Sequence, residues 1–332
     1  MIIQTRNYFY DGISLLKKLT PGRIWNYIKI MLSYRLSRMR KRPYIWAGPF
    51  SLSFETASVC NLKCPECIAG QGKIMRNRKF MEPELAQKLL ELHRKEAFYC
   101  NLYFQGEPFL HPEIYSIIRL AEERKYYSVI STNGHFLDEK NCRKIIDSGL
   151  SRLIVSLDGI EQQSYEAYRK GGNLETVASG IKRLSAMKKE RKTPHPFLVV
   201  QFLVNKTNEH QLEEVTGYVK KLGTDKLEFK SMQIYTDEGK KEFTPKNSRY
   251  NRYSDKTRRK ATSSGCFRLW SHMVITSDGD WVPCCYDKIP EYGMSGKEEL
   301  SKAVWKSPAM QDFRLSLLTG NGLPLVCSNC GG

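Results

Sequence analysis

The sequence predicts an α/β fold with a parallel sheet, in which each strand is followed by a helix that crosses back over the sheet. Between residues 51 and 230, short runs rich in β-branched and aromatic residues alternate with helix-like patterns of about ten to fifteen residues. This alternation is typical of parallel strands joined by helical crossovers. Three cysteines directly follow the first of these strands, and loops at such strand ends carry the chemistry in barrels of this class.

Six strand-like and five helix-like segments make up this alternation. The strands are expected at 51–56, 99–104, 127–131, 152–156, 197–204 and 226–230, and the helices at 83–92, 113–124, 138–148, 174–189 and 209–222. Together they predict six β/α units in a chain of 332 residues, which is long enough for one large core. The periodicity indicates only the alternation of strands and helices.

The first 48 residues form a strongly basic extension ahead of this region. Residues 1–50 carry ten Lys or Arg against the single acid Asp11, which is about half of the formal excess of +18. Residues 21–42 are expected to form an amphipathic helix that starts at Pro21-Gly22. Its apolar positions are Ile24, Trp25, Ile28, Met31, Leu32 and Met39, and its other side carries Arg23, Asn26, Lys29, Ser33 and Arg40. No run of about 18 uncharged apolar residues exists, so this segment is not a membrane span.

Two hypotheses account for the basic helix. A basic amphipathic helix with aromatic residues near its polar boundary can lie on an anionic membrane surface, which would make residues 1–42 a lipid-binding extension. Alternatively, the helix packs over the open end of a barrel. Nucleic acid would also suit the charge, but no RNA-binding module is recognisable, so we do not expect a nucleic-acid partner.

Cysteine usage indicates the compartment. Ten cysteines in a chain without a secretory signal at residues 1–6 are typical of a reducing cytoplasm, where clustered cysteines bind metals. We therefore expect a cytoplasmic protein, peripheral at the inner face of the membrane if residues 1–42 bind lipid.

The segment from Cys60 to Cys67 places Cys60, Cys64 and Cys67 at the spacing CxxxCxxC. Three thiolates on one tight loop can hold three irons of a four-iron cluster and leave the fourth iron open. A zinc site is the alternative, but zinc normally takes four protein ligands, and no fourth Cys or His lies within the loop. Scattered core thiols are a further alternative.

This spacing resembles the signature of the radical S-adenosylmethionine (radical SAM) superfamily. The resemblance implies that Cys60, Cys64 and Cys67 bind a [4Fe-4S] cluster, and that the amino and carboxylate groups of SAM chelate the open iron. Reductive cleavage of SAM then gives a 5′-deoxyadenosyl radical that abstracts hydrogen from substrate. The resemblance also implies a partial (β/α)6 TIM-like barrel over residues 49–232, and an electron donor such as flavodoxin or ferredoxin.

Three further stretches at predicted strand ends resemble the SAM-binding motifs of this family. They are Phe104-Gln105-Gly106-Glu107-Pro108, similar to a GGEP motif with Gln in place of the first Gly; Ser131-Thr132-Asn133-Gly134; and Ser156-Leu157-Asp158-Gly159 followed by Tyr168-Arg169. By resemblance, residues 105–108 hold the SAM amino group, Ser131 and Asn133 contact ribose or carboxylate, and Ser156 and Arg169 contact the carboxylate. An arginine fork suits a carboxylate because it donates two hydrogen bonds.

The chain departs from the family pattern at one position of the cysteine loop. Glu66 precedes the third cysteine, where the family often has an aromatic residue that stacks near adenine. We therefore expect the adenine contact to come from elsewhere, from Ile68 or the strand around Val204.

A second set of cysteines follows a basic linker or flap at residues 233–264. A strand at 273–276, a turn at 277–279 and a strand at 280–283 predict a β-hairpin, and a helix is expected from Ser307-Pro308 to Gly320. The thiols of Cys266, Cys284, Cys327 and Cys330 could together ligate a cluster, or a structural zinc ion.

This cysteine pattern resembles the shortened SPASM or twitch domain of some radical SAM enzymes. It implies a second, auxiliary [4Fe-4S] cluster within residues 265–332. The Gly-x4-Cys element from Gly279 selects Cys284, which leaves Cys285 as a spare thiol, a backup ligand or a hydrogen donor. Cys100 and Cys142 are expected to be core residues.

The four-cysteine spacing looks like that of the aminocyclitol dehydrogenase branch and, less closely, like that of peptide-modifying and sulfatase-maturing enzymes. It implies a two-electron oxidation or related modification of a sugar, polyol or peptide substrate, in which the auxiliary cluster accepts an electron. An RNA-modifying enzyme and a non-catalytic iron–sulfur or zinc scaffold are the alternatives. The candidates for the catalytic residue, by position alone, are Asp158 and Cys285, with Gln233, Tyr235 and Asp287 beside them.

Overall fold

The computed structural model describes residues 7–253, 265–294, 301–327 and 330. At its centre is an eight-stranded sheet with the order β6-β5-β4-β3-β2-β1-β7-β8. The first six strands are parallel: β1 (Ser51–Phe54), β2 (Tyr99–Asn101), β3 (Tyr127–Thr132), β4 (Arg152–Ser156), β5 (Phe197–Val204) and β6 (Lys226–Ser231). Each of these strands pairs with its neighbour in sequence, which confirms the predicted succession of β/α units in a partial barrel.

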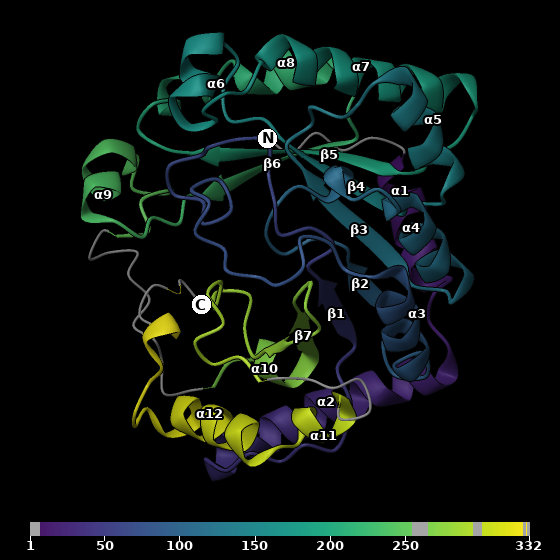
Figure 1. Cartoon of the computed structure of the whole chain (residues 1–332), viewed down its shortest axis with the longest axis vertical. Coiled ribbons are helices and arrows are strands. Elements are labelled where there is room, and N and C mark those ends of the chain that lie inside the picture. The colour runs from purple at the N-terminus through teal and green to yellow at the C-terminus, as the bar shows by residue number, and fades with distance from the viewer. Residues whose placement is uncertain (1–6, 254–264, 295–300, 328–329, 331–332) are drawn as a thin grey trace.

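Helices line the outer side of the curved sheet (Figure 1). The predicted crossovers are α3 (Pro83–Leu92), α4 (Ile114–Glu123), α5 (Glu139–Asp147), α7 (Leu174–Glu190) and α8 (Val215–Lys221). The helix predicted at 209–222 is divided into the 3-10 turn η2 (Glu209–Gln211) and α8. Elements absent from the sequence prediction are α1 (Asn7–Leu16), α6 (Gln162–Tyr168), α9 (Asp237–Phe243), α10 (Arg268–Ser271), α11 (Ser301–Trp305), and the 3-10 turns η1 (Pro108–Leu110) and η4 (Leu325–Cys327). Side-chain caps define the starts of two crossovers, because Asp138 accepts from the Asn141 amide at 2.8 Å and Asn173 from the Thr176 amide at 2.8 Å.

The main core lies between the sheet and these helices. Leu153 and Val155 of β4 and Val200 of β5 are fully buried, and they belong to one contiguous apolar cluster with residues of α3, α4, α5, α7 and α8. Cys100 and Cys142 are fully buried in the same cluster, which confirms their expected role in the core.

The predicted hairpin is present, and it extends the barrel sheet. Its strands are β7 (His272–Ile275) and β8 (Trp281–Val282), which pair antiparallel. In addition, β7 pairs in parallel with β1, with Ser53 opposite Val274. The sheet therefore joins the expected barrel domain, residues 49–232, to the expected C-terminal domain, residues 265–332. The segment after β8 lies next to the loop that leaves β1. Of the linker, α9 is described, whereas residues 254–264 lie outside the described residues.

The C-terminal region packs on the N-terminal helix α2 (Pro21–Arg40) beyond β7 (Figure 1). Helix α12 (Pro308–Thr319) begins at the cap Ser307 and ends at Gly320 in a left-handed conformation, as expected. Ile30 of α2 packs in a second apolar cluster with Trp270, and with Phe313 and Leu317 of α12.

The side of α2 that packs is its polar side. Arg23, Asn26 and Ser33 are buried, whereas Trp25 is 58% and Met39 80% exposed. The two predicted sides of the helix are therefore present, with the apolar side turned to solvent. No helix in the parts of the chain that the structure describes is long and apolar enough to cross a membrane.

Candidate active site

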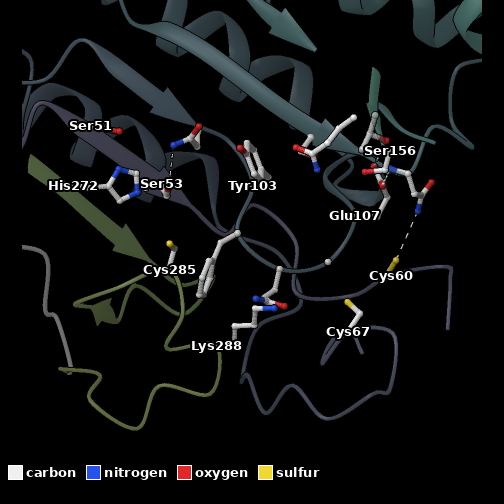
Figure 2. A pocket seen from close by; sticks show the side chains of 18 of the residues that line it. Ser51, Ser53, Cys60, Cys67, Tyr103, Glu107, Ser156, His272, Cys285 and Lys288 are labelled. Carbon is white, nitrogen blue, oxygen red and sulfur yellow. Dashed lines mark hydrogen bonds between the residues drawn. The ribbon is translucent and has the colours of Figure 1, made fainter. Parts of the chain in front are cut away.

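The loop after β1 brings Cys60, Cys64 and Cys67 to the wall of one pocket of about 770 Å³ (Figure 2). Backbone contacts shape the loop, because the Cys67 amide donates to the Cys64 carbonyl at 3.1 Å and the Lys63 amide to the Lys170 carbonyl at 3.0 Å. Gly70 lies so close that an added Cβ would stand 2.7 Å from the Cys64 amide nitrogen. The three thiols thus share a fixed loop at the C-terminal end of β1.

An apolar shell surrounds this loop. Leu62 and Cys64 pack with the buried side chains of Tyr168, Met232 and Phe243, and Cys60 and Cys67 lie against the same cluster. Burial raises the pKa of the Cys60 thiol to about 11, with the charge of Glu107 adding to the effect. A positively charged ligand such as iron would therefore be needed to hold the Cys60 sulfur as a thiolate.

Glu107 joins the segment after β2 to the segment after β3 through hydrogen bonds. The Glu107 carboxylate accepts from Thr132 Oγ1 at 2.8 Å, from the Asn133 amide at 2.8 Å and from the Phe109 amide at 3.1 Å. Burial raises the pKa of this carboxyl to about 6, against the lowering effect of these donors. With both oxygens already paired, the Glu107 side chain positions the two motifs, and Glu107 lines the pocket together with Gln105 and Gly106 (Figure 2).

Gly106 is required by the backbone at this point. Its φ of +69° lies in the left-handed region, and an added Cβ would stand 2.3 Å from the Ala57 carbonyl oxygen. Pro108 then begins η1 and is buried beneath the pocket wall. The glycine therefore lets the motif after β2 lie directly on the strand end that carries the cysteine loop.

Ser131, Asn133 and Ser156 complete this end of the pocket wall. The Asn133 amide nitrogen Nδ2 donates to Asn61 Oδ1 at 2.7 Å and reaches Cys60 Sγ at 3.8 Å. The motif after β3 is thus tied to the cysteine loop, so that motifs predicted separately form one surface.

Arg169 and Asp158 form an ion pair behind the cysteines. Arg169 Nε donates to Asp158 Oδ2 at 2.5 Å, and the Leu203 amide donates to Asp158 Oδ1 at 2.8 Å. Arg169 lines the pocket, where its charge opposes the effect of burial, which raises the pKa of Cys64. Asp158 is fully buried behind it, so the structure places this carboxylate as the orienting partner of Arg169.

Glu66 anchors the cysteine loop to the segment after β6. Its Oε2 accepts from the Tyr235 amide at 2.6 Å, and its Oε1 accepts from Thr236 Oγ1 at 2.5 Å. The residue that departs from the family pattern is therefore buried in a hydrogen-bonded junction. Of the two residues expected to contact adenine instead, Val204 is fully buried and Ile68 is half-buried.

The opposite end of the pocket is formed by β1, β2 and β7 and by the segment after β8 (Figure 2). Ser53 Oγ accepts from Asn101 Nδ2 at 3.0 Å and lies 3.0 Å from His272 Nε2. Burial lowers the pKa of His272 to about 4, so the ring is neutral at neutral pH. Sequence reasoning did not single out these three residues, because only the pairing of β7 with β1 brings His272 beside Ser53.

Cys285 and Arg268 lie at this same end, and Lys288 lies between Cys285 and Cys67 of the cysteine loop (Figure 2). Arg268 Nη1 donates to Cys285 Sγ at 2.9 Å. A hydrogen bond from Cys284 and the charge of Arg268 lower the pKa of Cys285, although burial opposes them.

Of the catalytic candidates that the sequence analysis named by position, Cys285 lines the pocket. Asp287 is buried with the Glu291 and Tyr292 amides donating to it, and Gln233 and Tyr235 lie outside the pocket wall.

The other C-terminal thiols do not line the pocket, and they lie close enough to influence one another electrostatically. Burial raises the pKa of Cys327 to about 11, and the charges of Cys330 and Cys266 add to the effect. The charge of Cys266 likewise contributes to the raised pKa of Cys284. The fold therefore gathers thiols from three separate segments, a set of soft donors that fits an iron–sulfur cluster.

Among the residues the structure describes, no three His, Cys, Asp or Glu side chains are arranged to hold one metal ion. The first group still fits an open four-iron cluster with SAM, because its three thiols face one pocket together with Arg169 and the exposed backbone at Gly106.

Comparison with known proteins agrees with these two groups of thiols. Residues 54–219 match the radical SAM superfamily, and residues 266–331 match an iron–sulfur cluster-binding domain, the SPASM domain. In Pyrococcus furiosus, the tungsten-containing aldehyde ferredoxin oxidoreductase cofactor-modifying protein is 27% identical over 316 residues, covering 84% of this chain and 86% of the relative.

Two solved structures are similar in fold. BtrN in complex with AdoMet and 2-DOIA is 18% identical with a TM-score of 0.54, and the match covers 86% of this chain and 94% of that chain. Streptococcus suis SuiB bound to the precursor peptide SuiA is 15% identical with a TM-score of 0.64, and the match covers 88% of this chain and 74% of that chain.

Proposed function

The chain belongs to the radical SAM superfamily and carries a SPASM domain, and from this premise we propose that it oxidises a hydroxyl-bearing small substrate of the sugar or polyol class by two electrons. Its cofactors are a SAM-binding [4Fe-4S] cluster, SAM and an auxiliary iron–sulfur cluster. The observation that carries the proposal is the division of one pocket into a SAM-binding end and a polar, hydrogen-bonding end.

At the first end, this chain's residues hold and orient the cofactors. Cys60, Cys64 and Cys67 are the proposed ligands of the open cluster. Arg169, oriented by Asp158, and Ser156 would grip the SAM carboxylate, while the backbone at Gln105 and Gly106 would accept from its amino group. Glu107 and Asn133 hold these segments in register.

At the second end, the lining favours a substrate with several hydroxyl groups. Ser53, Asn101 and His272 present a connected row of donors and acceptors that can exchange hydrogen bonds with neighbouring hydroxyls. Arg268 and Lys288 add positive charge beside Cys285. A pocket of about 770 Å³ falls within the range of roughly 300–1,000 Å³ common for small-molecule sites, and the volume is shared with SAM.

The proposed reaction converts a carbinol to a carbonyl. When bound, the cofactors would supply one-electron chemistry: a hydrogen atom would be removed from the carbinol carbon by a SAM-derived 5′-deoxyadenosyl group, and the remaining electron would pass to the auxiliary cluster. The hydroxyl proton leaves through the hydrogen-bonded row at Ser53 and His272. The proposed ligands of the auxiliary cluster are Cys266, Cys284, Cys327 and Cys330, and the source of the first electron is a flavodoxin- or ferredoxin-type donor.

The test is anaerobic reconstitution of the full chain, with iron and sulfide counted, followed by SAM, a reductant and a panel of polyols and aminocyclitols deuterated at the carbinol carbon. We expect deuterium in 5′-deoxyadenosine, formed one-to-one with a ketone product. Zinc in place of iron, or no SAM cleavage with the cluster present, would overturn the assignment as an enzyme.

A second set of reactions, with peptides in place of polyols, tests the substrate class separately from the enzyme activity. SAM cleavage that polyols fail to accelerate, with deuterium transfer only from a labelled peptide, would replace the small-molecule proposal by a peptide-modifying function. The variant His272→Ala provides the control, since we expect slower ketone formation with the SAM-binding cluster retained.

A further inference from the structure

The apolar side of helix α2 faces solvent along its whole length. Ile24 is 45%, Trp25 58%, Ile28 39%, Leu32 47% and Met39 80% exposed. At 100° per residue these five side chains fall within one third of the helix circumference. Large apolar side chains that are exposed together on one surface mark an interaction site, whereas single ones are ordinary.

The opposite side of α2 is already used by the fold. The Arg23 guanidinium donates to the carbonyls of Lys18 at 2.6 Å, Arg94 at 3.0 Å, Arg124 at 3.0 Å and Lys125 at 2.5 Å. Further along, Asn26 donates to the carbonyls of Gly48 at 3.0 Å and Glu96 at 3.2 Å, and Ile30 packs in the second apolar cluster. These contacts fix the rotation of α2, so the helix cannot turn to bury its apolar side.

Positive charge borders this apolar side. Arg35 lies within it, Arg38 and Arg40 are exposed toward its margins, and Lys41 and Arg42 follow directly. Between Asp11 and Glu55 the chain contains no acid. A contact with an average protein surface would not need such an excess, whereas an anionic surface of high charge density would balance it.

We propose that the exposed face of α2, formed by Ile24, Trp25, Ile28, Leu32, Arg35 and Met39, is a docking surface for an anionic phospholipid bilayer. The apolar side chains enter the boundary between headgroups and acyl chains, Trp25 lies at the headgroup level, and the arginines pair with lipid phosphates. Arg35 extends its guanidinium from the apolar face to the headgroups along its aliphatic stem. The helix lies flat on the surface, held to the enzyme by Arg23 and Asn26.

The proposal does not depend on the substrate or the reaction. The α2 face contains none of the residues that line the catalytic pocket, so its variants are expected to leave SAM cleavage unchanged. Because the five apolar side chains are exposed, replacing them should also leave the thermal unfolding of the chain unchanged.

The test is co-sedimentation of the reconstituted full chain with vesicles of phosphatidylcholine alone and of phosphatidylcholine mixed with phosphatidylglycerol. We expect binding that requires phosphatidylglycerol and weakens as salt is added. The triple variant Trp25→Ser, Ile28→Ser, Leu32→Ser should lose this binding. The double variant Arg35→Gln, Arg40→Gln should bind about 25-fold more weakly, at about fivefold per basic residue.

Matched controls replace exposed apolar residues elsewhere. Met75, which is 88% exposed, and Ile289, which is 59% exposed, are changed to Ser, and binding should be unaffected. Equal binding of the triple variant and the native chain would overturn the proposal. So would a chain that ignores phosphatidylglycerol, or one that forms a dimer in solution that the triple variant separates, since the face would then belong to a second copy.

Discussion

The two groups of thiols are built in opposite ways. Cys60, Cys64 and Cys67 lie on one loop of eight residues, and side chains of two neighbouring motifs, Asn133 and Glu107, hold that loop and its surroundings in place. The C-terminal thiols come from the start of α10, the segment after β8 and the end of the chain, and the fold alone brings them near one another.

The difference separates a site whose geometry is local from one whose geometry depends on topology. The first loop keeps its thiols together even if its surroundings move, whereas the second group requires α10, β8 and η4 to be in place at once. Cys285 joins the two, since it belongs by sequence to the second group and lines the pocket of the first. Substitutions that affect one thiol group and leave the other intact therefore test this comparison.

Two single variants, each lacking one thiol of one group, should give the largest difference in activity. Cys64→Ala removes a proposed ligand of the open cluster, and we expect 5′-deoxyadenosine formation to fall to the level without enzyme. Cys327→Ala should retain SAM cleavage while losing about half of the bound iron and the oxidised product. Product analysis by mass spectrometry, with iron content beside it, checks both. SAM cleavage at the native rate in Cys64→Ala would contradict the assignment of the first group.

The next largest effect should come from the ion pair behind the first group. Asp158→Asn leaves the charge of Arg169 without a buried partner, and breaking such a pair costs about 3 kcal/mol of unfolding free energy. We also expect the KM for SAM to rise about tenfold, since the guanidinium loses its orienting partner. Denaturant unfolding and SAM titration measure the two effects.

The matched control is Asp147→Asn, whose carboxylate pairs with Arg191 at the surface with 61% and 35% of the two side chains exposed. Exposed pairs contribute about 0–1 kcal/mol, so this variant should differ little from the native chain. A similar loss in both variants would mean that Asp158 has no special role in orienting Arg169.

Much of the fold was predictable because its signals are local. The strand–helix alternation, the caps at Asp138 and Ser307 and the turn at Gly279 depend on neighbouring residues, and the structure confirms the elements they indicate. The parallel pairing of β7 with β1 was not predicted, because β7 follows β1 by more than 200 residues and nothing in its composition names its partner. The orientation of α2 stayed open between a lipid-facing and a packed helix, since Arg23 is buried only through backbone carbonyls that the fold brings to it.

The residues of the candidate site likewise fall into a set that sequence motifs predict and a set that they do not. The residues predicted for the SAM-binding end carry recognisable motifs, and the fold brings them to one pocket wall. Ser53, Asn101, His272, Arg268 and Lys288 carry no motif, and they meet only through the β1–β7 pairing and the segment after β8. The substrate end was therefore visible only in three dimensions.

A smaller effect should distinguish the adjacent thiols of the second group. Cys284 interacts electrostatically with Cys266, whereas Cys285 contacts Arg268 at the pocket. Cys284→Ser should therefore lose the auxiliary cluster, and Cys285→Ser should keep both clusters and slow product formation about tenfold. Iron counting and electron paramagnetic resonance of the reduced chain give the answer. Loss of the auxiliary signal in Cys285→Ser alone would reverse the assignment of the two thiols.

The smallest effect on catalysis is expected at Glu66, which lies outside the pocket wall and connects the first group to the segment that leads toward the second. Glu66→Gln keeps an acceptor for the Tyr235 amide but removes the charge from this hydrogen bond and from the one with Thr236, a change that should cost about 1 kcal/mol. Glu66→Ala leaves these buried donors unpaired and should cost about 3 kcal/mol.

Gly239→Ala perturbs the hydrogen-bonded junction of Glu66 from the side of α9. An added Cβ would stand 1.9 Å from Glu66 Oε1 and displace the carboxylate. We expect its unfolding free energy to fall by at least as much as in Glu66→Gln. The double variant Glu66→Ala, Gly239→Ala should then lose less than the sum of the two single losses, since the carboxylate that the methyl group displaces is gone and only its contact with Ile234 Cγ2, at 2.9 Å, remains. Additive losses in this cycle, measured by denaturant unfolding, would show that the two positions act independently and that Glu66 does not anchor the cysteine loop to the segment after β6.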